Sequence, residues 1–176
     1  DISKIARSGK ITAKRIKQLE AKSDHDTAAL VEALAEKCNK ESRPWIHYGL
    51  TSNDLVDTSN SMQMRDAIKI IQPKVSKLSL ILAKNAVKHK SVPAVGRTHG
   101  QHASIISFGL KFANWAAEMS THLERLDEIK KRILICKTLG VVGTGSLMGK
   151  NAIKVQERVA MKLSLYPAKV TTQIVP

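Results

Sequence analysis

The longest regular pattern in the sequence is SIISFGLKFANWAAEMSTHLERLDEIKKRILIC, residues 104–136. Its apolar residues recur at spacings of three and four, the heptad pattern of a helix that packs along one seam. Such a helix would be roughly 50 Å long, more than the short helices of one chain this size can cover. The pattern therefore predicts an all-α fold, a long-helix bundle that is incomplete in this chain and completed by partner subunits. The seam comprises Ile105, Phe108, Phe112, Trp115, Met119, Leu126, Ile129, Ile133 and Cys136.

Helical periodicity extends to most of the remaining chain. Capping-box spacing, Ser23-x-x-Asp26 and Thr51-x-x-Asp54, marks two helix starts. Pro73 is predicted to start or kink the second half of the helix in which it lies, because its ring cannot continue the hydrogen-bond ladder. Helices are predicted over residues 10–21, from a start capped by Ser23, with His25 in the first turn, through Cys38, over 55–90 and over 151–163.

Four segments between or after these helices are predicted to be loops. Residues 41–50, ESRPWIHYGL, form a packed loop that delivers His47 to the next helix start, and residues 96–103, GRTHGQHA, form a polar loop between two long helices. Residues 137–149 are glycine-rich and expected to be flexible; Thr144 and Asn151 exclude a phosphate-binding P-loop. The last loop covers residues 169–176.

Composition indicates an ordinary soluble chain. Apolar residues make up 43% and charged residues 25%. Cys38 and Cys136 are expected to be buried thiols of a cytosolic protein. No apolar run approaches the roughly 18 residues that span a bilayer, and no export leader is visible, so a cytoplasmic location without membrane contact is predicted. The excess of 29 Lys and Arg over 15 Asp and Glu gives a charge of +14, which is spread along the helices.

The polar groups outside the helix faces indicate acid–base chemistry and anion binding. No metal site is predicted, because His99-x-x-His102 supplies only two ligands. Histidine suits proton transfer near neutral pH. Hydroxyl, amide and guanidinium groups suit carboxylate or phosphate recognition, as does the helix start at Thr51-Ser52. The candidates are His25, His47, His99, His102, Thr51, Ser52, Thr98, Thr144, Gln101, Gln173 and Arg97.

Two specific motifs resemble a known family. HYGLTSNDLVDT (47–58), and GRTHGQHA (96–103) followed by FGLKFANW (108–115), closely resemble the adenylosuccinate lyases of the fumarase/aspartase superfamily. Three further segments agree in order along the chain: KSDHDTAALVEALAE, LGVVGTGS and TTQIVP. The resemblance implies an all-helical homotetramer that needs no cofactor and builds each active site from several subunits. It also implies anti β-elimination of fumarate from adenylosuccinate to give AMP, and from the related succinylcarboxamide, in purine biosynthesis.

The same resemblance assigns roles residue by residue. It makes His99 the general acid that protonates the leaving nitrogen. Thr51 and Ser52 would bind the succinyl carboxylates or the phosphate, and Gln173 would hold the succinyl part. His47 and His25 would support substrate binding, while Arg97, Thr98 and Gln101 would orient His99. The substrate-binding set is thus His25, Asp26, His47, Thr51, Ser52, Thr98, Gln101 and Gln173.

The sequence departs from the family pattern at two places. Ser104-Ile105 follows GRTHGQHA where the family usually has Glu-Pro, and the signature loop of the type SSxMPxKxNP, which carries the serine base, is absent. Residues 1–50 are therefore expected to be the C-terminal part of an N-terminal helical domain. Residues 51–176 are expected to be the first part of the central bundle domain, and the chain is predicted to be inactive alone.

A second hypothesis is a basic helical module that binds nucleic acid or acts as a scaffold. It rests on the charge of +14 and on the long apolar seam. The two hypotheses differ in salt dependence, because binding to nucleic acid weakens steeply with salt. A lyase is expected to bind AMP and fumarate with moderate salt sensitivity, and to bind neither nucleic acid nor membranes. A third hypothesis, a superfamily relative that acts on another succinyl-type substrate, is disfavoured by the HYGLTSND motif.

Overall fold

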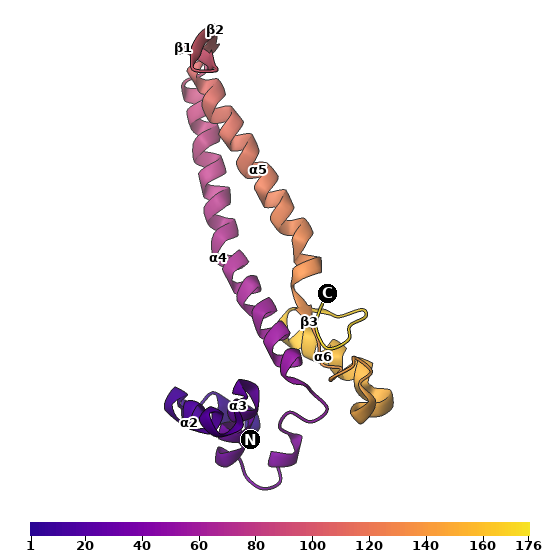
Figure 1. The fold of residues 1–176 in the computed structure, drawn as a ribbon. Coiled ribbons are helices and arrows are strands. Elements are labelled where there is room, and N and C mark those ends of the chain that lie inside the picture. The colour runs from indigo at the N-terminus through magenta and orange to yellow at the C-terminus, as the bar shows by residue number, and fades with distance from the viewer. The chain divides into compact units, whose positions relative to one another are not determined.

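The computed structural model describes all residues, 1–176, and the chain is mostly helical, as predicted. It divides into two compact units, residues 1–62 with 134–176 and residues 63–133 (Figure 1). No helix is both long and apolar enough to cross a lipid bilayer. The elements are α1 (Ile2–Ala6), α2 (Ala13–Ser23), α3 (Asp26–Lys37), η1 (Arg43–Trp45), α4 (Ser52–Lys88), β1 (Pro93–Thr98), β2 (Gln101–Ser107), α5 (Phe108–Ile133), β3 (Ile135–Cys136), η2 (Ser146–Asn151), α6 (Ala152–Leu163) and β4 (Tyr166–Pro167).

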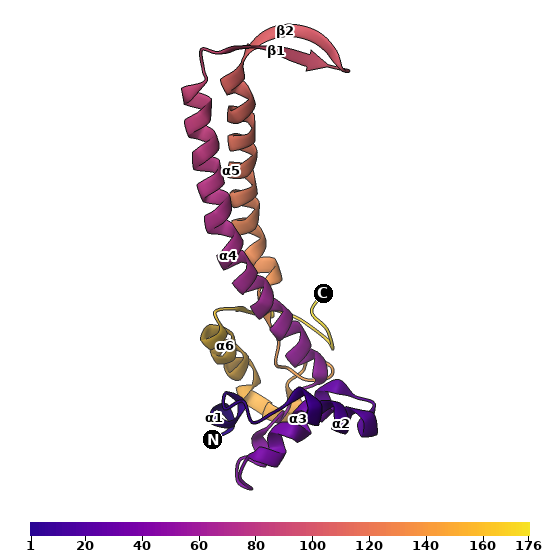
Figure 2. The ribbon, with the colours of Figure 1, turned by 90° about the vertical axis from the view of Figure 1, so that its left-hand side faces the viewer.

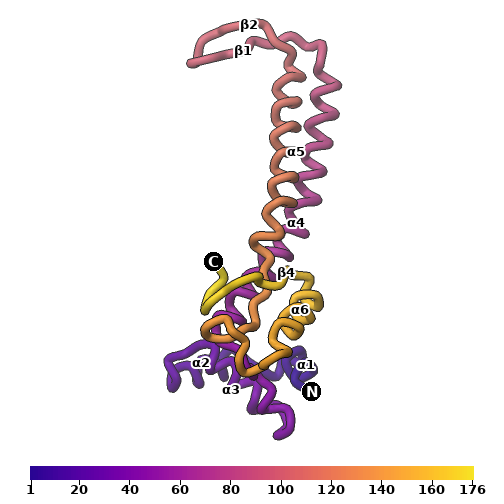
Figure 3. Tube along the Cα trace, turned by 90° about the vertical axis from the view of Figure 1, so that its right-hand side faces the viewer, coloured from indigo at the N-terminus to yellow at the C-terminus, as the bar shows by residue number.

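The first unit combines both ends of the chain, as the tube in Figure 3 shows. Its N-terminal part packs α2 against α3 through Leu19, Ala29 and Ala33. In its C-terminal part, β3 pairs in parallel with β4, and residue Gln156 of α6 is almost fully buried. The Gln156 side chain accepts the Thr138 N–H and donates to the Ala168 carbonyl, so α6 is hydrogen-bonded to the segments on both sides of it.

The start of α3 differs from the sequence prediction. The capping box predicted for Ser23 and Asp26 is wrong, because Ser23 is the last residue of α2 and its hydroxyl donates to the Leu19 carbonyl. His25 is the N-cap instead, and its Nδ1 accepts the Ala28 N–H at 3.3 Å. An imidazole nitrogen thus takes the place of the usual cap oxygen.

The second unit contains two long helical segments side by side, the later part of α4 and all of α5, with a hairpin at their end (Figures 1 and 2). The two helices approach closely at Gly109, since a Cβ atom there would be 2.4 Å from the Ala86 carbonyl oxygen. Farther along, Ser79 Oγ donates to the Ala116 carbonyl and Gln72 Nε2 to Asp127. Helix α4 continues through Pro73, so the first predicted alternative, a helix start at Pro73, is wrong, and the second, a kink there, stays a prediction.

The helix predicted over residues 104–136 is shorter in the structure. Strand β2 runs to Ser107, α5 covers only Phe108–Ile133, and Cys136 belongs to β3. At 1.5 Å per residue, α5 is roughly 39 Å long. Ile105 is 82% exposed on the hairpin and is no part of a helical seam. The predicted seam residues from Phe108 to Ile133 all lie on α5. At the start of this helix, the His89 ring contacts the Phe108 and Phe112 rings, with ring centroids 5.6 and 5.8 Å apart.

GRTHGQHA is a β-hairpin and not the predicted loop (Figure 2). Thr98 pairs with Gln101 and Arg97 with His102, which leaves His99-Gly100 as a two-residue turn. Both turn residues have positive φ, 51° and 73°, as a type I′ turn requires. The register shifts between Val95 and Arg97: Gly96 alone lies between them on β1, whereas Ala103 and Ser104 lie between their partners on β2, so β2 carries a bulge opposite Gly96.

The glycine-rich segment is packed where it begins, although flexibility was predicted for all of it. Lys137, Thr138 and Leu139 are buried. The Lys137 ammonium group forms an ion pair with Asp54 and donates to the Gly140 carbonyl at 3.0 Å. Thr58 Oγ1 also accepts the Lys137 N–H. These contacts fix residues 137–140 against the start of α4.

Two other loop predictions fare differently. A packed loop was predicted for residues 41–50. In the structure Trp45 is 67% exposed and contacts Tyr48 at 5.5 Å between ring centroids, so the prediction is wrong for the aromatic part of this loop. Residues 169–176 contain no helix or strand, which confirms the last loop. The boundary predicted between residues 50 and 51 concerns the domains of a longer protein and stays a prediction.

Candidate functional site

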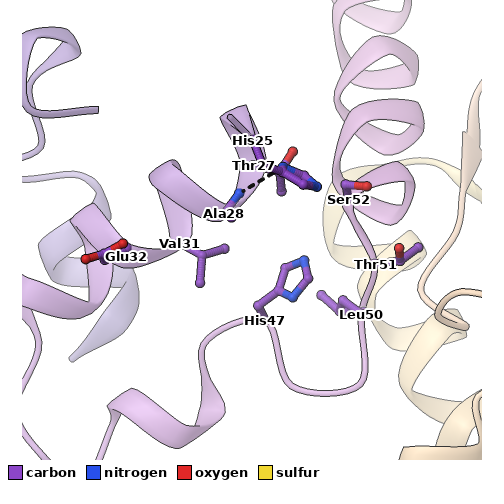
Figure 4. Close-up of a pocket in the computed structure, with 9 residues that line it drawn as sticks. All are labelled: His25, Thr27, Ala28, Val31, Glu32, His47, Leu50, Thr51 and Ser52. Carbon is purple, nitrogen blue, oxygen red and sulfur yellow. Dashed lines mark hydrogen bonds between the residues drawn. The ribbon is translucent and has the colours of Figure 1, made fainter. Parts of the chain in front are cut away.

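A pocket of about 380 Å³ lies in the first unit (Figure 4). Four predicted site residues line it, two from the start of α3 and the following loop and two from the start of α4. Helices fix the positions of their first-turn residues, so the pocket has a rigid frame with polar groups at its edge. The lining residues are His25, Thr27, Ala28, Val31, Glu32, His47, Leu50, Thr51 and Ser52.

The cap contact of His25 favours one tautomer when the ring is neutral. Its Nδ1 accepts the Ala28 N–H as the cap of α3, drawn as the dashed line in Figure 4. A nitrogen that accepts a hydrogen bond carries no proton, so the proton of the neutral ring is on Nε2. His25 can therefore donate one hydrogen bond from Nε2 to a bound group.

His47 has an unused hydrogen-bonding atom. Its Nε2 is buried and makes no hydrogen bond within the protein. In Figure 4 its ring stands between Val31 of α3 and Leu50. The residue also has a φ of 61°, the left-handed region that histidine enters more readily than most residues. A buried polar atom without a partner costs free energy that a ligand can recover by hydrogen bonding.

Thr51 and Ser52 supply the anion-binding edge of the pocket. Helix α4 begins at Ser52, and the first turn of a helix leaves N–H groups without partners in the helix. Half of the predicted capping box is present: the Asp54 carboxylate accepts the Thr51 N–H at 2.9 Å. The helix dipole and two hydroxyl groups favour a carboxylate or phosphate at this position.

Two predicted substrate-binding residues of this unit lie outside the pocket lining. Asp26 has an exposed carboxylate that accepts the Thr27 N–H, so its local contacts belong to the first turn of α3. Gln173 is exposed in the C-terminal loop, two residues before Val175, whose N–H donates to Asp57. Their roles stay predictions.

The remaining predicted residues are on the hairpin of the second unit. His99 is exposed at the turn, and Thr98 and Gln101 are the pair that closes it. Arg97 and His102 pair one step farther along, with Arg97 Nη2 3.4 Å from His102 Nε2. The hairpin thus carries an imidazole at its tip, with polar side chains directly behind it, and the role of His99 stays a prediction.

Sequence reasoning missed several members of the pocket. Glu32 is its only acidic lining residue, and Ala28 and Val31 lie beside it. The spacing 28, 31, 32 places the three on one face of α3, and this periodicity was the available signal. The buried Asp54–Lys137 pair behind the pocket was missed as well, because a lysine in a glycine-rich segment normally reaches solvent.

Neither cysteine takes part in this site. Cys38 and Cys136 are free and buried, as predicted. Burial raises the pKa of the Cys136 thiol, and the hydrogen bond with Thr58 opposes this only in part. A thiol with a raised pKa is a poor nucleophile at neutral pH. No group of three or more His, Cys, Asp and Glu side chains is arranged to hold a metal ion.

Comparison with known proteins decides the family. The model of a family described as lyase matches residues 2–175, nearly the whole chain. The chain belongs to this lyase family.

Curated relatives of this lyase-family chain are adenylosuccinate lyases, which confirms the resemblance found in the motifs. One from Methanocaldococcus jannaschii is 43% identical over 175 residues, covering 99% of this chain and 38% of the relative. One from Archaeoglobus fulgidus is 41% identical over 166 residues, covering 94% and 37%. The chain therefore spans somewhat more than a third of the length of the curated relatives that it matches.

Solved structures of the lyase superfamily share the fold. A fumarate lyase from Mesorhizobium sp. BNC1 superimposes with a TM-score of 0.88 at 30% identity, covering 97% of this chain and 40% of that one. A 3-carboxy-cis,cis-muconate lactonizing enzyme from Pseudomonas putida gives 0.86 at 30% identity, covering 94% and 39%. These neighbours confirm the predicted fold class, a long-helix bundle of the fumarase/aspartase type.

Proposed function

We propose that this chain is part of an adenylosuccinate lyase, which eliminates fumarate from adenylosuccinate to give AMP, and from the related succinylcarboxamide, in cytoplasmic purine biosynthesis. The observation that carries the proposal is the 43% identity over 175 residues to a protein of that name. The relatives with solved structures include other activities, so the fold alone does not select the substrate.

In the proposed reaction, a base removes a proton from carbon, the electron pair of that C–H bond forms the new double bond, and the C–N bond breaks. His99 donates a proton to the leaving nitrogen. Its position at the tip of an exposed hairpin allows it to reach a substrate held elsewhere in the assembly. The base comes from outside residues 1–176, because no serine in this chain lies in a signature loop of the family type.

The pocket of the first unit has the chemistry for the anionic part of such a substrate. Thr51 and Ser52 offer hydroxyl groups and a helix start, and His25 and His47 offer imidazole nitrogens. The net charge of +14 adds a long-range attraction for an anion that carries two carboxylates and a phosphate. We assign Asp26, Thr98, Gln101 and Gln173 supporting roles in binding.

The proposal is tested with the full-length protein, meaning a polypeptide that contains this chain and the further regions that the relatives have. It is expected to release fumarate from adenylosuccinate, observed as the ultraviolet absorbance change of the purine and of fumarate. The chain of residues 1–176 serves as the control and is expected to be inactive. A folded full-length protein that releases no fumarate would contradict the proposal.

We also propose that the protein is a homotetramer whose subunits meet along the long helices. The helices of the second unit carry many exposed large apolar side chains, and such surfaces in soluble proteins mark contacts with other chains. On α4 they are Ile70, Ile71, Leu78, Leu80, Ile81 and Val87, and on α5 they are Leu110, Trp115 and Ile129.

Light scattering after gel filtration is expected to give four times the subunit mass for the full-length protein. Leu80→Glu is expected to lower this mass, because a carboxylate would be buried in the interface without a partner. Gln18→Glu on α2 adds the same charge at an exposed polar position of the first unit and serves as a comparison. A full-length protein that stays monomeric at micromolar concentration contradicts the tetramer.

A further inference from the structure

One buried carboxylate connects the substrate pocket to a distant part of the chain. The Asp54 side chain is 1% exposed. Its Oδ2 accepts two backbone N–H groups, those of Thr51 and Gly140, each at 2.9 Å. Its Oδ1 accepts the Lys137 ammonium group. Asp54 therefore fixes the residue just before α4 to a segment more than 80 positions away in the sequence.

Gly140 extends this connection to the loop that carries His47. Gly140 has a φ of +77°, and a Cβ atom there would be 3.0 Å from the Gly49 carbonyl oxygen. The loop thus rests directly on the Gly140 backbone. The Lys137 ammonium group donates to the Gly140 carbonyl at 3.0 Å and closes a ring of contacts around Asp54.

None of Asp54, Lys137 and Gly140 lines the pocket. Their contacts are with Thr51, which lines it, and with Gly49, next but one to His47. Any influence on a ligand must pass through these neighbours. The charge of Asp54 is moreover balanced inside the ring, so Asp54 adds no net negative charge near the anion-binding helix start.

We propose that Asp54 is a positioning residue for substrate binding, and that Gly140 completes its action by supporting the loop that carries His47. The inference rests on the proposed function, because it concerns the same pocket. It adds the glycine-rich segment 137–140 to the parts of the chain that determine how well substrate binds.

A positioning role has a kinetic signature that a purely structural role lacks. Thr51 and Ser52 are assigned to anionic groups that bind equally in the ground state and the transition state, so displacing these residues raises KM and leaves kcat nearly unchanged. Loss of folded protein does the opposite: it lowers the concentration of active enzyme and hence the apparent kcat, while KM stays the same.

Gly140→Ala in the full-length protein tests the proposal, because it leaves the ion pair in place and adds one methyl group against the Gly49 carbonyl. We expect KM for adenylosuccinate to rise at least about tenfold, with kcat within about threefold of wild type, as for a small displacement of binding groups. Gly9→Ala is the matched control, since Gly9 has a similar φ of +69° and open space around its Cβ position.

Asp54→Asn is the second variant, which removes the charge and one of the carboxylate acceptors. We expect a larger KM increase together with a lower melting temperature, because Lys137 loses its counter-ion. If Asp54→Asn does not fold, Gly140→Ala decides alone. An unchanged KM in Gly140→Ala, or an equal rise in Gly9→Ala, overturns the positioning role. A wild-type protein without fumarate release overturns the proposed function and this inference together.

Discussion

Replacing His99 by alanine in the full-length protein is expected to lower kcat for fumarate release by about 10²–10⁴-fold, the usual contribution of a general acid. The leaving nitrogen would then depart without a proton from the enzyme. KM is expected to change little, because the groups assigned to hold the substrate anions are on other segments. Steady-state kinetics with adenylosuccinate measures both constants.

A second substitution distinguishes the loss of the imidazole from a disruption of the turn. His99 has a φ of 51° in a type I′ turn, where asparagine is favoured. His99→Asn therefore keeps the hairpin and removes only the proton donor, and it is expected to lose as much activity as His99→Ala. His102→Ala, on the strand behind the turn, is expected to lose far less. Activity of His99→Asn within about threefold of wild type would exclude His99 as the acid, given the size of such effects.

Lys137→Met is expected to have the largest effect on stability, a loss of about 3–5 kcal/mol. The Lys137 side chain is fully buried, and its removal leaves the Asp54 carboxylate buried without a counter-ion. The two backbone N–H groups that Asp54 also accepts compensate the charge only in part. Denaturant unfolding of the full-length protein, followed by circular dichroism, measures the change.

Two further variants accompany Lys137→Met: a double variant expected to restore stability and a variant of a surface ion pair as a control. Adding Asp54→Asn to Lys137→Met makes both partners neutral and is expected to restore part of the lost stability, as a double-mutant cycle would show. Arg15→Met breaks the ion pair between Arg15 and Glu36, which is solvent-exposed, and is expected to leave the unfolding midpoint almost unchanged. A midpoint shift of Lys137→Met no larger than that of Arg15→Met would refute the importance of the buried pair.

Periodicity predicted the helices well where one face is buried and the ends have conventional signals. Helix α6 begins at Ala152 and ends at Leu163, against a prediction of 151–163. Helix α2 runs from Ala13 to Ser23, against 10–21. The error at its start arises because Thr12 caps the helix by accepting the Arg15 N–H, a signal that lies two residues inside the predicted range.

The hairpin escaped prediction because its signals were ambiguous. A type I′ turn is usually recognised by Asn-Gly or Asp-Gly, whereas here the left-handed positions are taken by His99 and Gly100. Ile105 also fits the helical seam as well as a strand, since an apolar residue three before Phe108 continues the heptad spacing. The strand is decided by pairing with Val95, which is a tertiary contact.

The pocket residues His25, His47, Thr51 and Ser52 were predicted through the family resemblance, and the structure brings them together. The residues behind them could not be found in that way. Asp54 was predicted as a capping partner of Thr51, and its carboxylate does accept the Thr51 N–H. Its ion pair with Lys137, more than 80 positions later, was not predicted. Such pairings are set by the fold and leave no local pattern.

The close approach of α4 and α5 at Gly109 influences the orientation of the hairpin that precedes α5. Strand β2 of the hairpin ends at Ser107, two residues before Gly109, and its seven residues place the turn roughly 20 Å away at about 3.3 Å per residue. In Gly109→Ala, the added methyl group would collide with the Ala86 carbonyl oxygen and increase the separation of α4 and α5. A tilt of the hairpin by roughly 5° over this distance would move His99 by nearly 2 Å. Misplacements of about 1 Å already slow enzymes about 100-fold. The spacing of two helices at one glycine can therefore control where the proposed acid is held.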